Sequence, residues 1–501
     1  MSQDLEKSSI GDKERFEVDA GPLEHVASVN KGDRITRLRR LLLGHVESRG
    51  VAPVPNEERT DRRGYSVFGV WFTSNFCLLP IATGMSGTSV MGLSLRDASL
   101  IIIFFVLIFT VPVAWLGMMG PKTGLRQMIQ TRYYFGYYLA TIVVILQLAT
   151  LTGYTIIISI VSGQTLAALS SGHLSINVGI ILIVILSLVV SFMGYRILHI
   201  FETWSWIPTL VALIATLAVG GKHPSSQAEA PPASARAVVT FGSIVASLSI
   251  SWCAVVSDFA VYVSPTVPRY RTFFYVYAGY CLPSIPLLVL GAAIGGAVPT
   301  IPSLTAANNA YSVGGVMYAM VSPVGDFSKF IGVLLAFSVI GIAAATLYAL
   351  SISLALLFPI GLLARVPRFL YAILIVAIVI PVAIVASTNF YASLSNFLGI
   401  IGYWTAVYAG IALAEHHYFR KTSYDSYDHA IWDVPGKLPV GFAALVSGLL
   451  CFALIVPSMD AVWYTGSIAR HTGDIGIEVG IVLAVILFIP LRALEIRIFG
   501  R

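Results

Sequence analysis

The fold is decided by residues 137–194, which read YYLATIVVILQLATLTGYTIIISIVSGQTLAALSSGHLSINVGIILIVILSLVVSFMG and contain no Asp, Glu, Lys or Arg. A helix needs about 20 apolar residues to cross the hydrocarbon core of a bilayer, so this stretch has room for two crossings. The clearest turn signal within it is LSSGHLS, residues 169–175. We therefore predict two membrane-spanning helices here, at 137–169 and 174–194.

The composition extends this conclusion to the rest of the chain, which has 501 residues, 57% of them hydrophobic and only 11% charged. Soluble domains carry about 25% charged residues, so the sequence indicates an integral membrane protein. Residues 1–63 hold 12 Lys or Arg and 12 Asp or Glu, so the net charge of +6 belongs to the remainder. A basic excess placed in the loops of a membrane protein bears on its topology and does not indicate a nucleic-acid partner.

Apolar runs of spanning length recur along the chain, separated by turns and charges. They predict an all-α polytopic membrane protein with 12 transmembrane helices. The predicted spans are 67–90, 98–119, 137–169, 174–194, 200–221, 238–263, 271–297, 326–358, 368–388, 390–415, 439–457 and 475–495.

The distribution of Lys and Arg predicts that both ends of the chain are cytoplasmic, because cytoplasmic loops carry an excess of these residues. With the N-terminus inside, the cytoplasmic loops hold eleven bases and the opposite loops hold four. The cytoplasmic set is 120–135, 195–199, 264–271, 359–368 and 416–438, and the opposite set is 91–97, 222–237, 298–325 and 458–473.

No catalytic or metal-binding constellation is found in the sequence, so we expect neither an enzyme nor a bound cofactor. The glycines of VLGAAIGGAV, residues 289–298, lie in an apolar run with no Lys or acid after them. We interpret them as positions where helices pack closely and not as a nucleotide-binding loop. Four cysteines in apolar runs are interpreted as small buried hydrophobes. They are Cys77, Cys253, Cys281 and Cys451.

Several long motifs, in order along the chain, point to a known family. They are RGVAPVPNEERTDRR before the first span, GPKTGLRQMIQTRYYFGYY after the second, LHIFETWSWIP at the fifth, SWCAVVSDFAVY in the sixth, NFLGIIGYWTAVYAGIALAEHHYFR in the tenth and VWYTGSIARHTGDIG near the end. Over about residues 45–501, these stretches together resemble the fungal purine–cytosine permeases of the nucleobase–cation symporter-1 family.

The resemblance implies a leucine-transporter-type five-plus-five inverted repeat with two further C-terminal helices. It also implies a plasma-membrane importer that works as a monomer and moves a small heteroaromatic solute with an ion gradient. The implied organisation is a cytoplasmic tail at 1–63, a transport core of spans 1–10 at 64–415, a cytoplasmic loop at 416–438, and the last two spans with the C-terminus at 439–501.

In such folds the substrate lies at the bilayer midplane, where broken helices one and six expose backbone groups. Span one contains SNFCLLPIATGMSG, residues 74–87, in which Pro80, Gly84 and Gly87 interrupt the apolar run. Span six has no Gly or Pro between Gly242 and Pro265, so its break is expected from the resemblance alone.

By similarity, Trp252 is the sixth-span tryptophan that stacks on the base. The register of the third span gives Tyr154, which can stack, and Ile158, which replaces a hydrogen-bonding Asn. In span eight the polar string of cytosine and purine carriers is replaced by IAAAT, residues 342–346, where only Thr346 is polar. Our other candidate substrate-binding residues are Asn75, Thr83, Gly84, Ser251 and Asn396.

These departures leave the substrate open, because each unpaired polar edge of a ring in a dry pocket costs about 1–3 kcal/mol. Either the other candidate residues bind the ring edge, or the ligand is less polar than cytosine. We expect a purine or cytosine-type nucleobase, and a vitamin-type ring such as pyridoxine, or allantoin, is the alternative within the family. A non-transporting ligand sensor is the alternative from a different class.

Two acids, Glu202 and Asp258, lie within the first seven spans, where ionisable groups are costly and are taken as functional. Asp258 follows Trp252 by six residues, about 9 Å along a helix. We predict that Glu202 carries the coupling proton and that Asp258 gates the site or pairs with a basic loop residue such as Arg269. A static interfacial cap is the alternative for Glu202. Sodium is the alternative ion, for which Thr346 alone would supply little of a site.

Overall fold

The computed structural model describes residues 51–192, 204–221, 226–357 and 368–501. All of them belong to the compact unit Glu47–Arg501. The described part is helical apart from one short two-stranded hairpin. Glu202 lies outside it, as does most of the predicted tail 1–63.

Each of the first five predicted spans is helical in the part that the structure describes. The first half of the chain contains η2 (Asn56–Glu58), α2 (Tyr65–Asn75), α3 (Leu78–Ser89), α4 (Leu95–Gly117), α5 (Met119–Thr123), α6 (Gln127–Phe135), α7 (Ala140–Leu169), α8 (Ile176–Phe192) and α10 (Trp206–Gly220).

The next five predicted spans are also helical, with several interruptions. This part contains α11 (Ala235–Ile250), η4 (Ser251–Ala254), η5 (Val256–Phe259), α12 (Arg269–Ala297), η6 (Val298–Thr300), α13 (Pro302–Val321), η7 (Ser322–Val324), α14 (Phe327–Phe337), α15 (Ile340–Leu357), α16 (Arg368–Ala386), η9 (Ser387–Asn389) and α17 (Phe390–Ala414).

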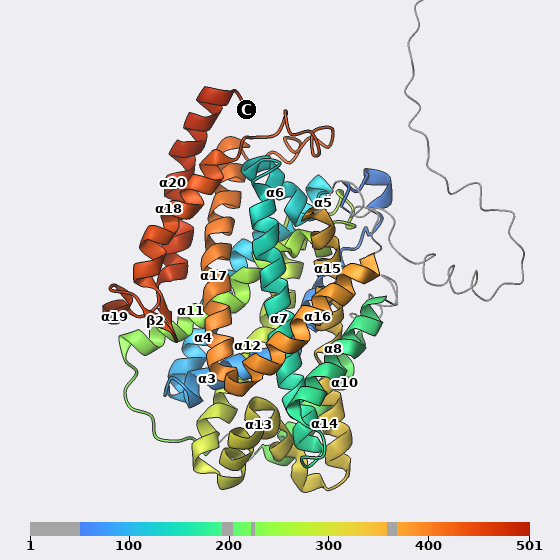
Figure 1. Ribbon diagram of the computed structural model, residues 1–501, viewed down its shortest axis with the longest axis vertical. Coiled ribbons are helices and arrows are strands. Elements are labelled where there is room, and N and C mark those ends of the chain that lie inside the picture. The colour runs from blue at the N-terminus through green and yellow to red at the C-terminus, as the bar shows by residue number, and fades with distance from the viewer. Residues whose placement is uncertain (1–50, 193–203, 222–225, 358–367) are drawn as a thin grey trace, which may run out of the picture. The chain divides into compact units, whose positions relative to one another are not determined.

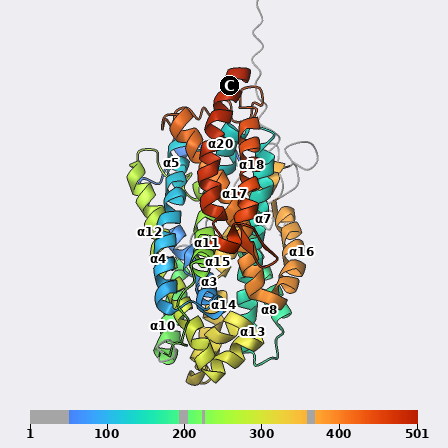
Figure 2. The same cartoon turned by 90° about the vertical axis from the view of Figure 1, so that its left-hand side faces the viewer.

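The C-terminal part adds two long helices joined by a small hairpin. It contains the π-helix η10 (Glu415–Phe419), α18 (Phe442–Ser458), β1 (Asp460–Ala461), β2 (Tyr464–Thr465), α19 (Ala469–Thr472) and α20 (Gly476–Phe499). β1 and β2 pair antiparallel, with Asp460 opposite Thr465. α18 and α20 lie side by side next to α17 (Figures 1 and 2).

Among the described residues, seven helices are long and apolar enough to cross a bilayer, and counting the bent pair α2 and α3 as one span makes eight. The prediction of an all-α polytopic membrane protein is therefore confirmed. α2 and α3 meet at 51°. Between them Cys77 is extended, with φ −146° and ψ −177°, so the break lies just before α3. Pro80, Gly84 and Gly87, where we expected the interruption, lie inside α3.

Span six is broken although it contains neither Gly nor Pro. α11 ends at Ile250, and the chain continues as the short 3-10 turns η4 and η5. Between these turns Val255 has φ −141° and ψ −9°, outside the helical region. Ser257 makes two hydrogen bonds outside its own span. Its N–H donates to Gln127 Oε1 at 3.2 Å, and its hydroxyl donates to Leu116 O at 3.0 Å. Neighbouring segments thus satisfy the polar groups that the break releases.

Two segments that we predicted as loops are helical. Residues 120–135 contain most of α5 and all of α6, in which every residue from Gln127 to Phe135 is buried. Residues 298–325 contain α13, which is kinked at Tyr311 and Ser312. Both helices were missed because the prediction counted apolar runs of spanning length, and these segments carry too many polar residues to register as spans.

The close packing of α3 on α12 explains several glycines. An added Cβ at Gly84 would lie 1.9 Å from Leu288 O, and one at Gly291 would lie 2.1 Å from Ile81 O. The helix backbones therefore touch, and the packing interpretation is confirmed for Gly291 and Gly295, whereas Gly296 faces the Gln227 side chain. α5, α6 and the chain's C-terminus lie at one end of the bundle, and α13 lies at the opposite end (Figures 1 and 2).

Candidate functional site

A cluster of five rings lies where the breaks of spans one and six meet, and we call it the aromatic cluster: Trp71, Tyr154, Trp252, Tyr280 and Phe397. Tyr154 and Trp252 are stacked with ring centroids 5.2 Å apart and an interplanar angle of 20°. Trp71 meets Trp252 edge-on at 5.4 Å, and Phe397 meets Tyr154 edge-on at 5.2 Å. Tyr280 lies 6.5 Å from Trp71. Such pairs stabilise a core beyond their buried area and offer flat faces to a flat ligand.

Tyr154 and Trp252 were predicted as the stacking pair, and the structure brings them together. Trp71, Tyr280 and Phe397 were missed. Trp71 stands four residues before Asn75 in span one, so a tryptophan next to the predicted break was the available signal. Tyr280 and Phe397 carry no comparable signal, because their proximity depends on how α12 and α17 pack.

The Tyr154 hydroxyl is bound at the break of span six. It lies 2.5 Å from Ser251 Oγ, and it donates to Leu248 O at 3.4 Å. Ser251 is buried and opens η4. The third span is therefore joined to the broken part of span six through two of the predicted residues, Tyr154 and Ser251.

Three further predicted residues direct their side chains to their own helices. Asn75, Thr83 and Thr346 are buried, and each donates to the carbonyl four residues earlier, at 2.9, 3.1 and 2.6 Å respectively. These donors are therefore engaged by the backbone. A role in binding would use the second N–H of the Asn75 amide or the remaining acceptor capacity of the three groups.

The other predicted positions lie in different surroundings. Gly84 faces the backbone of α12, and Ile158 is fully buried within α7. Asn396 accepts a hydrogen bond from the Val462 N–H at 3.0 Å, so its amide ties α17 to the hairpin that follows α18. The structure thus groups Trp252, Tyr154 and Ser251 and gives Asn396 a partner outside the aromatic cluster.

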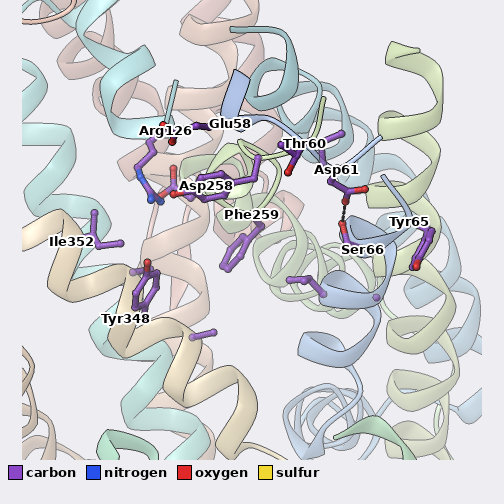
Figure 3. A pocket seen from close by; sticks show the side chains of 16 residues that line it. Glu58, Thr60, Asp61, Tyr65, Ser66, Arg126, Asp258, Phe259, Tyr348 and Ile352 are labelled. Atoms are coloured by element: carbon purple, nitrogen blue, oxygen red, sulfur yellow. Dashed lines mark hydrogen bonds between the residues drawn. The ribbon is translucent and has the colours of Figure 1, made fainter. Parts of the chain in front are cut away.

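A cavity of about 580 Å³ opens beside the aromatic cluster. It is lined by η2 and the segment after it, α2, the start of α6, η5 and α15 (Figure 3). Its volume falls in the range of small-molecule sites, about 300–1,000 Å³. Phe259 lines the cavity and meets Trp71 edge-on at 5.7 Å. One wall of the cavity is therefore in contact with the aromatic cluster.

The cavity is polar at the end near α6. Glu58, Arg126 and Asp258 line this end, and Figure 3 shows the Arg126 guanidinium beside the Asp258 carboxylate. Asp61 lines the cavity on the side of Ser66, to which it is hydrogen-bonded. Asp258 Oδ1 accepts a hydrogen bond of 2.7 Å from the Gln127 N–H, the first residue of α6. An anion is stabilised at a helix N-terminus by the unpaired N–H groups and the helix dipole. The predicted acid Asp258 is thus placed between the cavity and α6.

Outside the spans, burial raises the pKa of Asp474, and hydrogen bonds from Tyr403 and the Gly476 N–H oppose this shift. The Gly476 N–H donates to Asp474 Oδ1 at 3.0 Å, and the Tyr403 hydroxyl donates to Oδ2. In the described ranges, no group of three or more His, Cys, Asp or Glu residues is placed to hold a metal ion.

Broken helices around buried rings, beside a cavity at one end of a helical bundle, define a membrane transporter. Residues 53–461 match the family model described as permease for cytosine/purines, uracil, thiamine, allantoin. The chain belongs to this family of permeases, and the resemblance found in the sequence is confirmed. It is a transporter and not an enzyme.

Curated relatives align over almost the whole chain. A purine-cytosine permease of Emericella nidulans is 31% identical over 463 residues, covering 91% of this chain and 90% of the relative. A purine-cytosine permease of Saccharomyces cerevisiae is 32% identical over 472 residues, covering 91% and 87%. A vitamin B6 transporter of the same yeast is 24% identical over 516 residues, covering 91% and 88%.

Solved structures share the fold. The nucleobase-cation-symport-1 family transporter Mhp1, in a closed conformation with bromovinylhydantoin bound, matches with a TM-score of 0.68 and 14% identity. That match covers 91% of this chain and 96% of Mhp1. A Na⁺-coupled sialic acid symporter in a substrate-bound outward-open state matches with a TM-score of 0.56 and 12% identity, covering 91% and 92%.

Proposed function

We propose that the protein imports a small planar heteroaromatic ring, of the purine or cytosine type, across the plasma membrane. The observation that carries this proposal is the buried stack of Tyr154 on Trp252 at the break of span six, next to a cavity of ligand size. Flat aromatic faces bind a flat ring, and a few polar groups then fix its orientation. Curated relatives named as purine-cytosine permeases support this substrate class.

A vitamin-type ring is the second candidate substrate, and the third and eighth spans favour it. Ile158 is fully buried and offers no hydrogen bond, and the Thr346 hydroxyl donates to its own helix. A less polar ring leaves fewer unpaired edges in such surroundings. The relative named as a vitamin B6 transporter supports this alternative.

The coupling ion in this proposal is a proton carried by Glu202, and Asp258 gates the site or pairs with a basic loop residue such as Arg269. Asp258 lines the cavity, which supports a role on the path between the aromatic cluster and one end of the bundle. One charge moving through 100 mV supplies about 2.3 kcal/mol, enough for substantial accumulation of a neutral ring. Uptake that persists in sodium-free buffer and is abolished by a protonophore indicates proton coupling. Uptake that is lost when sodium is removed indicates sodium coupling.

The proposed architecture has twelve spans, with an inverted repeat in the first ten. Eight apolar spans include the bent pair, three shorter apolar helices (α8, α10 and α18) bring the number to eleven, and dividing the 50-residue stretch Leu370–Phe419 into α16 and α17 gives twelve. Helix packing supports the repeat: α3 packs on α12 as α11 packs on α4, and α7 packs on α16 as α15 packs on α8. Spans one and seven thus pack together as spans six and two do, and spans three and nine pack together as spans eight and four do. Exchanging the first five spans with the second five therefore converts each pair into its counterpart.

The proposed orientation places α5, α6 and the C-terminus in the cytoplasm. These elements lie at one end of the bundle (Figures 1 and 2), and the loops assigned to that end carry most of the basic residues. The cavity at the start of α6 is then cytoplasmic. In this proposal a single chain is the working unit.

The test is uptake of radiolabelled substrate in a host that lacks its own permeases. Adenine, guanine, hypoxanthine, cytosine, uracil, allantoin and pyridoxine are compared as competitors against one accumulated label. Accumulation of a ring compound under an acid-outside gradient is the expected result. Binding to purified protein without accumulation in the host would favour the sensor and contradict the transport proposal.

A further inference from the structure

Most hydrogen-bond donors of the predicted site are already bonded within the protein. Other protein groups are therefore needed to bind the polar edge of the ring. The amide of Asn75 and the hydroxyls of Thr83 and Thr346 donate to their own helices, and the Tyr154 hydroxyl binds the break of span six. Ile158 has no polar atom. Apart from the second N–H of Asn75, the donors of these groups are engaged, so the polar edge of the substrate needs further partners.

Three polar atoms of the aromatic cluster have no hydrogen-bond partner among the described residues: Trp71 Nε1, Trp252 Nε1 and the Tyr280 hydroxyl. Their side chains belong to residues that are only 1%, 4% and 0% exposed. Buried polar groups in native proteins are paired in the large majority of cases, and an unpaired group calls for a specific explanation. Three in one ring cluster point to a ligand that completes them.

These atoms come from three different elements that meet at Trp71. Trp71 lies on α2, Trp252 on η4 and Tyr280 on α12, with Trp71 in ring contact with both of the others. Ser249 and Ser284 are polar neighbours of the Tyr280 hydroxyl, but neither meets hydrogen-bond geometry within the described part of the chain. The unpaired atoms therefore sit on the broken helices and on the helix packed against them.

We propose that Trp71 and Tyr280, together with Trp252, are the residues that bind the polar edge of the substrate and determine its specificity. The two indole N–H groups can only donate, and the Tyr280 hydroxyl can donate or accept. The preferred substrate is therefore an uncharged planar ring whose edge carries at least two acceptors, either ring nitrogens or carbonyl oxygens. This inference rests on the proposed function, because it assumes that the ring binds at Trp252.

Binding in this cluster requires a movement whose size the geometry gives. Tyr154 and Trp252 are in direct contact, with centroids 5.2 Å apart. A ring inserted between them needs about 7 Å between the two faces, because stacked carbon atoms approach to about 3.5 Å. Trp252 lies on η4, a four-residue turn bounded by the break at Val255, so it can separate from Tyr154 without moving a whole helix.

The variants Trp71→Phe and Tyr280→Phe test the proposal, because each keeps an aromatic ring and removes the polar atom. Matched controls are Trp204→Phe, at a position 60% exposed, and Tyr277→Phe, one turn earlier on α12, whose hydroxyl donates to Leu107 O. The probes are radiolabelled adenine, cytosine and pyridoxine, measured as KM for uptake and as Kd in purified protein. We expect about 3- to 10-fold weaker binding in the two test variants, the range for one lost hydrogen bond, and no change in the controls.

A second measurement uses the unaltered protein, so it does not depend on any variant folding. A probe analogue in which one acceptor ring nitrogen is replaced by C–H should bind more weakly than its parent. Replacing the same ring nitrogen should change the Kd less in the variant, Trp71→Phe or Tyr280→Phe, that already lacks the donor to that nitrogen. Analogues that bind the unaltered protein as well as their parents would overturn the inference.

The two proposals fail in distinguishable ways. If the unaltered protein accumulates none of the probes, the proposed function fails. If it accumulates one of them and both test variants keep its KM and Kd, only the assignment of Trp71 and Tyr280 fails. Melting temperatures in detergent show whether each variant is folded.

Discussion

Gly84 lies where α3 crosses α12, and an added Cβ there would come within 1.9 Å of Leu288 O. The same glycine was predicted as a substrate-binding residue, because it lies in the interrupted part of span one. A packing glycine and a substrate-binding glycine differ in what an added Cβ would meet, which is a neighbouring helix in the first case and the ligand in the second. At Gly84 that neighbour is a carbonyl of the adjacent helix, which a side chain cannot displace without separating the helices.

Gly84→Ala is therefore expected to destabilise the protein by about 1–3 kcal/mol, the range for overpacking a well-packed interior. The measurement is thermal unfolding of the purified protein in detergent. Gly69→Ala is the matched control in the same span, because an added Cβ there has no neighbour within 4 Å among the described residues. A Gly84→Ala protein with unchanged melting temperature and a raised KM would instead place this residue in the binding site.

Single residues of the site differed in how far the sequence could predict them. Tyr154 and Trp252 were predicted from aromatic type and motif register, and their stacking in the structure is consistent with that register. The position of Trp71 next to the predicted break was a signal that went unused, whereas Tyr280 could not be assigned because no sequence pattern reports the distance between α2 and α12. Glu202 lies outside the described residues, and its role stays a prediction.

At the scale of elements, the break of span six shows that a helix can end without a breaking residue. Neither Gly nor Pro marks it, and the cause lies in partners from other segments. Gln127 accepts from the Ser257 N–H at 3.2 Å and donates to the Tyr408 hydroxyl at 2.9 Å. α6 thus holds η5 in place and joins it to α17, which a span-by-span reading of apolar runs cannot detect.

Gln127→Leu should leave the Ser257 N–H buried without its partner, which costs about 1–3 kcal/mol. We expect a lower melting temperature and reduced uptake per folded molecule, because η5 and the cavity wall at Phe259 lose their support. Gln130→Leu is the control on the same helix, since the Gln130 amide donates to Leu125 O at 2.8 Å. Equal losses of uptake in both variants would show that α6 acts through its general stability and not through its link to span six.

The element that joins α19 to α20 carries a buried acid with a measurable pH signature. Burial raises the pKa of Asp474 above its ordinary 3.8. The folded protein therefore binds this proton more tightly than the unfolded chain, and the stabilisation is lost as pH rises from about 4 through the raised pKa. Asp474→Asn should remove this part of the pH dependence and flatten the fall in melting temperature with rising pH.

The control for this prediction is Asp326→Asn. Asp326 is exposed beside Lys329, which lowers its pKa, so its contribution is opposite in sign and screened by solvent. Melting curves of the three proteins between pH 4 and pH 8 compare them directly. If the melting temperature of the Asp474→Asn variant exceeds that of the unaltered protein by more at low pH than at high pH, the assigned direction of the pKa shift is wrong.

At the scale of the whole molecule, hydropathy alone placed a helix in each of the twelve predicted ranges, because a crossing requires a long apolar run. The same criterion missed α6 and α13, because both helices carry polar residues that interrupt an apolar run. It also gave no account of how the last two helices are held to the first ten. The structure supplies one: a buried ion network at the end of α17 comprising Glu415, Arg420, Arg492 and Glu495.

In this network Glu415 pairs with Arg420 at 3.1 Å and with Arg492 on α20 at 3.3 Å. Glu495 accepts the N–H groups of Gly441 and Ala443 at the start of α18, at 2.7 and 3.2 Å. Arg492 and Glu495 lie 3.5 Å apart, so the network runs from α17 through α20 to α18. Its carboxylates are almost fully buried, where removing one member leaves charges that water cannot solvate.

Glu415→Gln is expected to cost about 3–5 kcal/mol, because it removes the buried counter-charge of Arg420 and leaves Arg492 paired with Glu495 alone. Asp433→Asn is the control: it removes an ion pair with Arg132 in which Asp433 is 53% exposed, and such pairs contribute about 0–1 kcal/mol. The double variant Glu415→Gln with Arg492→Gln should lose less stability than the sum of the two single changes, because both single changes break the same Glu415–Arg492 pair. Melting temperatures and protease cleavage in the 416–438 loop report whether the last two helices loosen. If the double variant is less stable than the sum of its single changes, charge pairing is not what holds α20 and α18 against α17.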